Sequence, residues 1–309
     1  MNISPFSLLL KGIFRGISSR IHRALFKGQY PTFLLLAVTE RCNCRCSMCH
    51  IWRKESPTEP SPDLIRTIFN DPLWKQTRIL SLTGGEPFLR QDLAEVILAG
   101  AELLPRLERI SMPTNGLLPD RIEAITRDVL SRLPAHIDLK IGVSLDGPSE
   151  VHNAMRGIPG AHERALKTVQ ALHSLESERF SVGILSLLTK ENSPYLRKCH
   201  EHFCTLTDQI TYTLGTESEF FQNVSDPEAL LTPEAEALII EFTQDVLIRQ
   251  YPEKAYLYYK YRDHLLQHRR TYPCLAGYRS AYVDSAGRLF PCHYVGEEFS
   301  FGRYEPGVA

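Results

Sequence analysis

Four cysteines lie close together in the stretch "CNCRCSMC", at positions 42, 44, 46 and 49. Thiolates are the usual protein ligands of iron–sulfur clusters and are common ligands of zinc. Cys42, Cys46 and Cys49 have the spacing C-x3-C-x2-C, so three thiolates can hold three irons of a 4Fe–4S cubane and leave the fourth iron open. Cys44 breaks this spacing, and we expect it to take no part in the cluster.

A zinc site is the alternative interpretation of the same stretch. Structural zinc needs four closed ligands, commonly in two separated pairs. His50 is a candidate fourth ligand, but it adjoins Cys49, and its side chain is expected to point away. The residues therefore leave two classes of protein open: an enzyme with an open iron site, and a non-catalytic module that binds zinc or an iron–sulfur cluster.

Four other polar or glycine-rich stretches each follow a short apolar or β-branched run. They are "TGGEP" (83–87), "TNG" (114–116), "SLDGP" (144–148) and "GTESE" (215–219). Helical stretches lie between the runs; one of them, "SPDLIRTIF", begins with Ser61 as a typical cap and Pro62 at the first helical position. Six strand–helix alternations predict parallel strands whose carboxyl ends meet at one edge of the sheet. We therefore expect the cysteines and these four loops to form one site.

The same alternation predicts the fold class. We expect an α/β protein: a partial (β/α)6 TIM-like barrel with an N-terminal amphipathic helix and a small C-terminal β-hairpin extension. The continuous apolar runs predict strands that are buried on both faces. Four segments are expected: a basic amphipathic helix over 1–30, the barrel core over 31–232, a helical linker over 233–270 and the extension over 271–309.

The N-terminal segment has five basic residues and no acidic residue before Glu40. Its apolar residues form one stripe of a helix from Phe6 to Lys27. Such a helix either packs on the main domain or lies on an anionic membrane surface. The N-terminus shows no signal-peptide cleavage site, which indicates a reducing compartment, where clustered cysteines bind metal more often than they form disulfides. We therefore expect a cytoplasmic protein, with peripheral membrane contact through this helix as the variant.

The cysteine stretch, followed by "GGEP", "TNG" and "SLDG", resembles the radical S-adenosylmethionine (SAM) enzymes over residues 32–214. The resemblance implies an enzyme with two cofactors, a 4Fe–4S cluster on the three spaced cysteines and SAM. It also implies that the enzyme cleaves SAM reductively and takes hydrogen from a substrate. The residues that the family pattern assigns to SAM binding are Met48, Gly84, Gly85, Glu86, Thr114, Asn115, Ser144 and Arg156.

Three of these residues have a specific expected role. Gly84 and Gly85 are expected to let the backbone approach the methionyl amine of SAM, because a side chain would collide with it. Arg156 resembles the arginine that pairs with the SAM carboxylate, a role that suits a planar bidentate donor. Met48 departs from the pattern, since the family usually has an aromatic residue before the third cysteine.

Near the C-terminus, Cys274, Gly287 and Cys292 match the opening C-x9-15-G-x4-C pattern of the SPASM or Twitch extensions of this family. The resemblance implies a truncated extension that holds a second iron–sulfur cluster beside the substrate. Two cysteines fall short of the usual four ligands. The candidates to complete the set are Cys199, Cys204 and His293. The alternatives are a degenerate extension with a thiol pair or buried cysteines, and a catalytic thiol.

The substrate is less closely defined than the cofactors. The resemblance implies a flavodoxin- or ferredoxin-like electron donor and a substrate that is a peptide, a sugar or other small molecule, or a lipid. Glu217 and Glu219, after the sixth strand, are candidate catalytic residues, because a carboxylate there could move a proton or anchor an amine. From residue 40 onward the net charge is −6 (30 basic minus 36 acidic residues), which argues against a nucleic-acid partner.

Overall fold

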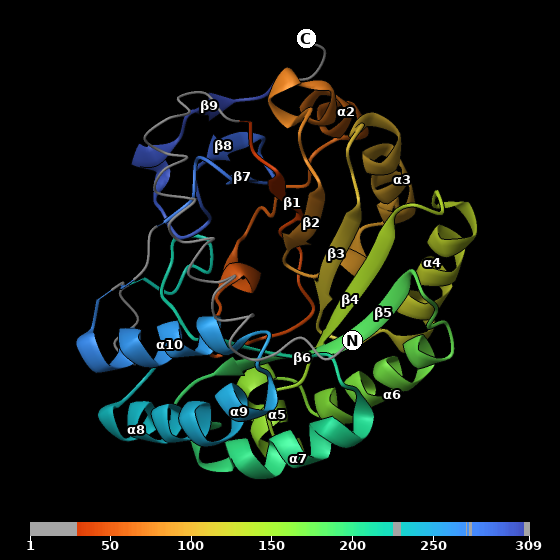
Figure 1. Cartoon of the computed structure of the whole chain (residues 1–309). Helices are drawn as coiled ribbons and strands as arrows, with labels where there is room; N and C mark the ends of the chain where they lie inside the picture. The colour runs from red at the N-terminus through yellow and green to blue at the C-terminus, as the bar shows by residue number, and fades with distance from the viewer. Residues whose placement is uncertain (1–29, 225–229, 270, 272–273, 306–309) are drawn as a thin grey trace.

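A computed structural model describes residues 30–224, 230–269, 271 and 274–305 (Figure 1). The predicted helix from Phe6 to Lys27 lies outside these residues. The described chain forms an α/β fold whose strands belong to one nine-stranded sheet, in the order β6-β5-β4-β3-β2-β1-β7-β8-β9. Within the described residues, no helix is both long and apolar enough to cross a membrane.

Six parallel strands make up most of the sheet, which confirms the predicted alternation. Their bounds are β1 Phe33–Thr39, β2 Ile79–Gly84, β3 Arg109–Thr114, β4 Asp138–Ser144, β5 Phe180–Leu188 and β6 Ile210–Leu214. Consecutive strands are neighbours and pair in parallel. Because every crossover runs the same way, the loops after these strands gather at one edge of the sheet.

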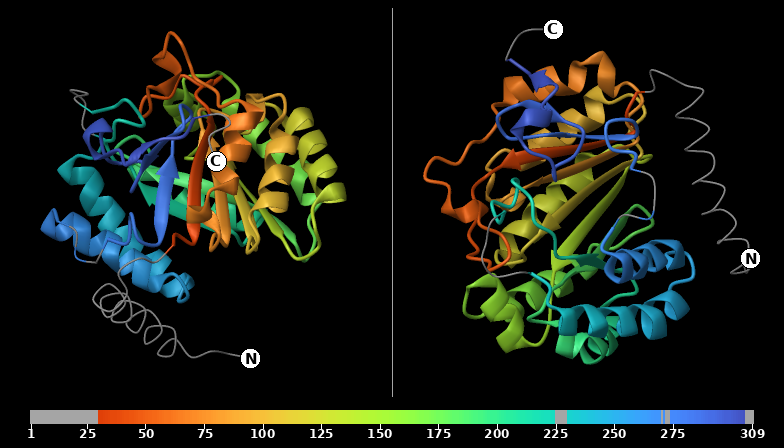
Figure 2. Two further views of the ribbon diagram at one scale, coloured as in Figure 1. Left: turned by 90° about the horizontal axis from the view of Figure 1, so that it is seen from above. Right: turned by 90° about the vertical axis from the view of Figure 1, so that its left-hand side faces the viewer.

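Helices cover the outer, convex face of this sheet (Figures 1 and 2). They are α2 Pro62–Asn70, α3 Leu93–Leu103, α4 Pro119–Arg132, α5 Ser149–Arg156, α6 Ala161–His173 and α7 Leu196–Leu206. The predicted start of α2 is confirmed: the Ser61 hydroxyl accepts the Leu64 N–H at 3.2 Å, and Pro62 is the first helical residue. Three further helices follow β6: α8 Pro233–Phe242, α9 Ile248–Gln250 and α10 Ala255–Gln267.

The two faces of the strands differ, and here the sequence-based expectation was wrong. In β4, Leu139, Ile141 and Val143 are buried against the helices. The alternate residues of β4, Lys140 and Gly142, instead line a cavity on the concave face. The strands are therefore not packed equally on both faces, because side chains alternate along a strand and the inward ones here are small or polar.

The C-terminal residues form the predicted hairpin, but the hairpin extends the main sheet. Strand β7 (Ser280–Val283) pairs in parallel with β1, and β8 (Arg288–Phe290) and β9 (Gly302–Arg303) follow in antiparallel order. The Asp284 carboxylate fixes the turn by accepting the Ala286 and Arg288 N–H groups at 3.0 and 2.8 Å. The sheet thus curves from β6 at one edge to the hairpin at the other (Figure 2).

Candidate active site

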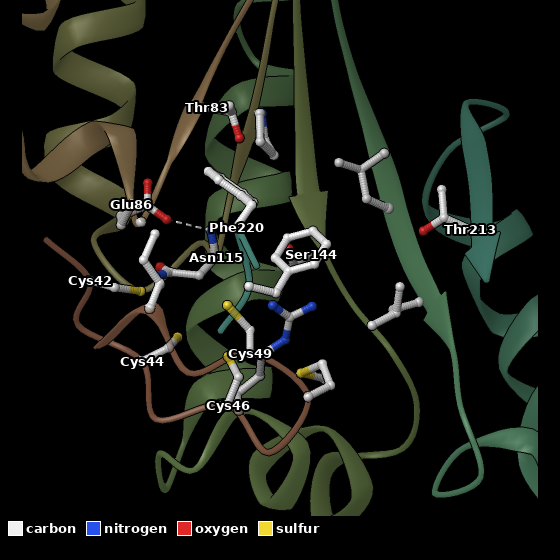
Figure 3. A pocket seen from close by; sticks show the side chains of 18 of the residues that line it. Cys42, Cys44, Cys46, Cys49, Thr83, Glu86, Asn115, Ser144, Thr213 and Phe220 are labelled. Carbon is white, nitrogen blue, oxygen red and sulfur yellow. Dashed lines mark hydrogen bonds between the residues drawn. The ribbon is translucent and has the colours of Figure 1, made fainter. Parts of the chain in front are cut away.

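A cavity of about 320 Å³ lies at the carboxyl edge of the parallel strands (Figure 3). It is lined by the four clustered cysteines and by residues from the ends of β2 to β6. All eight residues that the sequence assigns to SAM binding line it: Met48, Gly84, Gly85, Glu86, Thr114, Asn115, Ser144 and Arg156. The predicted convergence of separate loops on one site is therefore present in the fold.

The cysteine loop follows β1 and faces this cavity (Figure 3). The Cys44 side chain is buried, and its thiol hydrogen-bonds with both Cys42 and Cys46. That contact lowers the pKa of Cys46 to about 7, while burial raises the pKa of Cys49 to about 12. Cys44 thus lies within the group of thiols, a position that the irregular spacing did not indicate.

Two neighbouring segments hold the cysteine loop in place. From α5, the carbonyl groups of Arg156 and Met155 accept the N–H groups of Arg45 and Ser47, each at 2.9 Å. From the loop after β6, the Asn223 side chain donates to the Met48 carbonyl at 2.9 Å. The loop is therefore fixed through its backbone, which leaves the thiol groups free to act as ligands.

Gly84 and Gly85 are required by the protein's own backbone. A Cβ on Gly84 would lie 2.0 Å from the Thr39 carbonyl oxygen, and one on Gly85 would lie 2.2 Å from the Arg41 carbonyl oxygen. Gly84 also has a φ of +135°, which only glycine adopts readily. The reason expected from the sequence was collision with SAM; in this structure the first collision is with the start of the cysteine loop.

Glu86 connects the loop after β2 to the end of β3. Its carboxylate accepts the Thr114 hydroxyl at 2.9 Å. It also accepts the Asn115 N–H at 2.7 Å (Figure 3). Burial raises the pKa of Glu86 to about 7. The Asn115 amide then donates to the Asn43 side chain at 2.6 Å. Glu86, Thr114 and Asn115 thus brace one another and the cysteine loop.

Arg156 is held by a fully buried carboxylate. Its Nε donates to Asp146 Oδ2 at 2.7 Å, and His152 Nδ1 lies 3.2 Å from the same oxygen. Arg156 holds the pKa of Asp146 well below its usual range, although burial alone would raise it. The other Asp146 oxygen accepts the Leu187 N–H at 3.1 Å. Because Nε is occupied by Asp146, the two terminal amino groups of Arg156 are the part available to the cavity.

His50 does not face the cysteines as a ligand would. Its two ring nitrogens lie 3.1 Å from the carbonyl oxygens of Gln222 and Ser47. Within the part of the chain that the structure describes, no three His, Cys, Asp or Glu side chains gather closely enough to hold a single metal ion. A cubane makes no such demand, because its thiolates bind different irons. The contacts of His50 with these two carbonyl groups do not place its ring as the fourth ligand of a zinc site on the cysteines.

The loop after β6 covers the cavity with aromatic rings. Phe220 and Phe221 line it, and the Phe221 carbonyl accepts the His50 N–H at 2.7 Å. Glu217 and Glu219, the candidate catalytic residues, are exposed and are not among the lining residues. The Glu219 carboxylate instead accepts the Glu297 N–H at 3.3 Å. The loop after β6 therefore reaches the site, as expected, but it does so through Phe220 and Phe221 and not through the two glutamates.

The C-terminal cysteines do not line the cavity that the first group lines. Cys274 is exposed and Cys292 is half-buried. His293 packs in an aromatic cluster with the rings of Phe220, Phe221, Tyr282 and Tyr294, and burial lowers its pKa to about 4. Cys199 and Cys204 were the other candidate ligands of a second cluster. They lie on α7, which is well away from β8 (Figures 1 and 2).

Comparison with known proteins identifies the family. The model of the Radical SAM superfamily matches residues 36–201, more than half of the chain. The chain belongs to the radical SAM superfamily. Membership implies a 4Fe–4S cluster and SAM as cofactors, and a reductant and a substrate as partners.

Two curated relatives and one solved structure illustrate the similarity. A protein named "Probable GTP 3′,8-cyclase" from Archaeoglobus fulgidus is 36% identical over 151 residues, 46% of this chain and 49% of that protein. An AdoMet-dependent heme synthase from Methanosarcina barkeri is 25% identical over 289 residues, 86% of this chain and 77% of that protein. The chain thus spans about half the length of the first of these radical SAM relatives.

The solved structure is Streptococcus suis SuiB bound to S-adenosylmethionine. It superposes with a TM-score of 0.60 at 18% identity, covering 94% of this chain and 67% of SuiB. At that identity the likeness concerns the fold alone. It extends beyond the segment matched by the radical SAM model and includes most of the C-terminal part of the chain.

Several residues of the site were not found by sequence reasoning. Asn43, Asp146, Phe221 and Asn223 have ordinary types at positions without a metal-ligand or acid–base spacing. Their importance comes from partners far away along the chain: Asn223, for example, bonds to Met48, 175 residues earlier. Asn43 and Asp146 had a local signal, because they belong to the "CNCRCSMC" and "SLDG" stretches.

Proposed function

We propose that this radical SAM protein is an enzyme that cleaves SAM reductively and takes hydrogen from a substrate bound next to the cavity. One observation carries the proposal: the spaced cysteines, the GGE loop and the arginine held by Asp146 all line a single cavity. A non-catalytic cluster-binding module would have no need for this convergence.

The thiols fit a 4Fe–4S cluster held by Cys42, Cys46 and Cys49. These three line the cavity, and their loop is held by backbone hydrogen bonds rather than by the sulfur atoms. The lowered pKa of Cys46 favours the thiolate form that binds iron. Cys44 keeps its proton and donates it to the sulfur atoms of Cys42 and Cys46, which favours the thiolate form of these two residues.

The remaining lining residues fit SAM. In our proposal the terminal amino groups of Arg156 bind its carboxylate, and the backbone at Gly84 and Gly85 leaves room for its amine. Ser144 contributes a hydroxyl, and Met48 and Phe220 exclude water. With the cluster, SAM supplies a carbon radical that can take a hydrogen atom from an unactivated C–H bond. Glu86, Thr114 and Asn115 act as positioning residues for the cysteine loop.

For the substrate we propose two classes, a peptide or a small molecule. SuiB has been crystallised with its precursor peptide SuiA, whereas the named relatives act on GTP or in heme synthesis. A peptide and a small molecule are therefore both supported as substrate classes.

We further propose that the hairpin is a truncated SPASM- or Twitch-like extension, with Cys274 and Cys292 as candidate ligands of a second cluster. Contact with anionic membranes through residues 6–27 is a separate proposal, testable by liposome co-sedimentation at low and high salt.

The central proposal is tested by anaerobic reconstitution with iron and sulfide. The parent protein should be brown, and its paramagnetic resonance signal should change when SAM is added. Replacing Cys42, Cys46 and Cys49 together by Ala should abolish that response, whereas Cys199→Ala on α7 is the matched control and should keep it. A colourless zinc protein, or a response that survives the triple change, would mean that this function is wrong.

A further inference from the structure

A second cavity of about 430 Å³ adjoins the first and runs along the concave face of the sheet. The two cavities share part of their lining: Thr83, Pro113, Leu185, Thr213, Phe220 and Phe221. From these residues the second cavity continues toward the amino ends of the strands. Its position puts it next to the space proposed for SAM.

The sheet register explains why the interior is hollow. Ser81, Ser111 and Lys140 lie side by side across β2, β3 and β4. Two residues further along, Gly142 lies beside Gly183. Closed barrels fill this space with bulky branched side chains, but serine and glycine are too small to do so. The cavity therefore follows from the residue types at inward positions.

Lys140 gives this cavity its charge. Of the described residues that line it, only Lys140 and His293 can carry a positive charge, and burial lowers the pKa of His293 to about 4, so this ring is neutral near pH 7. The Lys140 ammonium donates to Gln209 Oε1 at 3.0 Å. It has three donors, so two remain for a ligand.

In the part of the chain that the structure describes, no carboxylate neutralises this ammonium. Among the described residues, none forms an ion pair with Lys140 within 4.0 Å; Asp138 pairs instead with Arg109 at 3.4 Å. Burial and the neighbouring cations Arg109 and Lys254 lower the pKa of Lys140, while Asp208 and Asp138 attract the ammonium from a greater distance. A partly buried cation without a paired anion is unfavourable, and a ligand anion would relieve that cost.

We propose that the second cavity binds the substrate and that Lys140 holds an anionic group of it, a carboxylate or a phosphate. This inference rests on the proposed function, because it places the substrate beside SAM. The hydroxyls of Ser81 and Ser111, in the same row, can donate to the same anion. Phe220, Phe221 and His293 provide an aromatic wall for the carbon skeleton.

The spacing along β4 sets the length of the substrate. Lys140 and Ser144 are four residues apart in this strand, which corresponds to about 13 Å between their Cα atoms. Ser144 lines the first cavity and Lys140 the second. A substrate whose anionic group binds Lys140 and whose reacting carbon lies beside SAM, near Ser144, must be extended, with the anionic group distant from the carbon that loses hydrogen. Small anions such as acetate are too short.

The test uses simple anionic probes on the reconstituted, SAM-bound protein, with affinities measured by calorimetry. The probes are phenyl phosphate, 3-phenylpropionate and the neutral 3-phenylpropanol. We expect the anions to bind more tightly than the alcohol, and Lys140→Gln to weaken anion binding roughly 10- to 100-fold, as expected for a hydrogen-bonded charge. Lys140→Arg should retain binding, and Lys167→Gln, an exposed lysine on α6, is the matched control.

The outcomes separate this inference from the function on which it rests. If Lys140→Gln binds both anions as tightly as the parent, the anion site is wrong, even if SAM cleavage proceeds normally. Tight binding of only the phosphate or only the carboxylate supports the site and identifies the source of the anion. A measurement that needs no variant is protection of Lys140 in the parent from an amine-reactive reagent by the tighter probe. Absence of protection would also overturn the inference.

Discussion

The Arg156 side chain donates through Nε to the buried Asp146 carboxylate at 2.7 Å, which fixes the guanidinium at the edge of the cavity. The pair joins the end of β4 to α5, the helix that also holds the cysteine loop. The short helix α5 therefore positions both the cysteine loop and Arg156. Anything that loosens this ion pair should affect SAM binding and stability together.

Asp146→Asn tests that coupling. The change leaves Arg156 charged, buried and without its partner, so we expect a loss of about 3–5 kcal/mol in the free energy of unfolding and weaker SAM binding. Urea unfolding and calorimetry with SAM measure the two effects. The control is Asp138→Asn, whose ion pair with Arg109 is half exposed and should contribute less than about 1 kcal/mol. Equal effects of the two variants would contradict the role given to Asp146.

The buried Glu86 predicts an unusual pH dependence of stability. Its pKa is about 7 in the folded protein and near 4.5 when exposed, so the folded state binds more protons between these values. The free energy of unfolding should therefore fall as pH rises from about 4.5 to 7, by up to about 3 kcal/mol from this group. Urea midpoints at pH 5, 6, 7 and 8 measure it. Glu86→Gln should flatten the slope and the exposed Glu108→Gln should not; an unchanged slope in Glu86→Gln would refute the assignment.

Gly85→Ala should damage the cysteine loop as well as SAM binding. The added Cβ would lie 2.2 Å from the Arg41 carbonyl oxygen, so the loop must move. We expect reduced iron content after reconstitution and loss of SAM cleavage. Gly147→Ala, whose added Cβ comes no closer than 3.2 Å to a side chain, is the control and should keep its iron. Full iron content in Gly85→Ala would show that the loop tolerates the shift.

Cys44→Ala should keep the cluster even though Cys44 is buried among the other thiols. The C-x3-C-x2-C set is complete without it, and Cys44 acts toward Cys42 and Cys46 as a hydrogen-bond donor, which does not require it to bind iron. Iron and sulfide analysis should give parent values for Cys44→Ala and a large loss for Cys46→Ala. A matching loss in both variants would make Cys44 a ligand or an essential support of the loop.

The sequence was informative where the signal was local. Six strands, the cap at Ser61 and the grouping of the strand-end loops all follow from short-range patterns, and the structure confirms them. The concave face was predicted wrongly because a run such as "RILSLT" looks mainly apolar, although its polar residues Ser81 and Thr83 fall on the inward side.

The contacts that brace the site depend on residues distant in sequence. The bond from Asn115 to Asn43 spans 72 residues, and neither amide differs in type from an ordinary surface asparagine. The need for glycine at position 85 was anticipated, but its cause, the carbonyl of Arg41, becomes visible only when two loops are placed side by side. Spacing identifies ligands, whereas the supports of those ligands require the three-dimensional structure.

The parallel pairing of β1 with β7 has a consequence for how this protein is made. Phe33 is opposite Ser280, so β1 has only one neighbouring strand until Ser280–Val283 has been synthesised. Contacts so far apart in sequence form slowly, and an unpaired strand edge invites association with other chains. The cysteine loop follows β1 directly. We therefore expect stable insertion of iron to follow synthesis of the C-terminal hairpin, and a nascent chain that stalls before residue 280 should aggregate rather than accumulate as a metal-loaded intermediate.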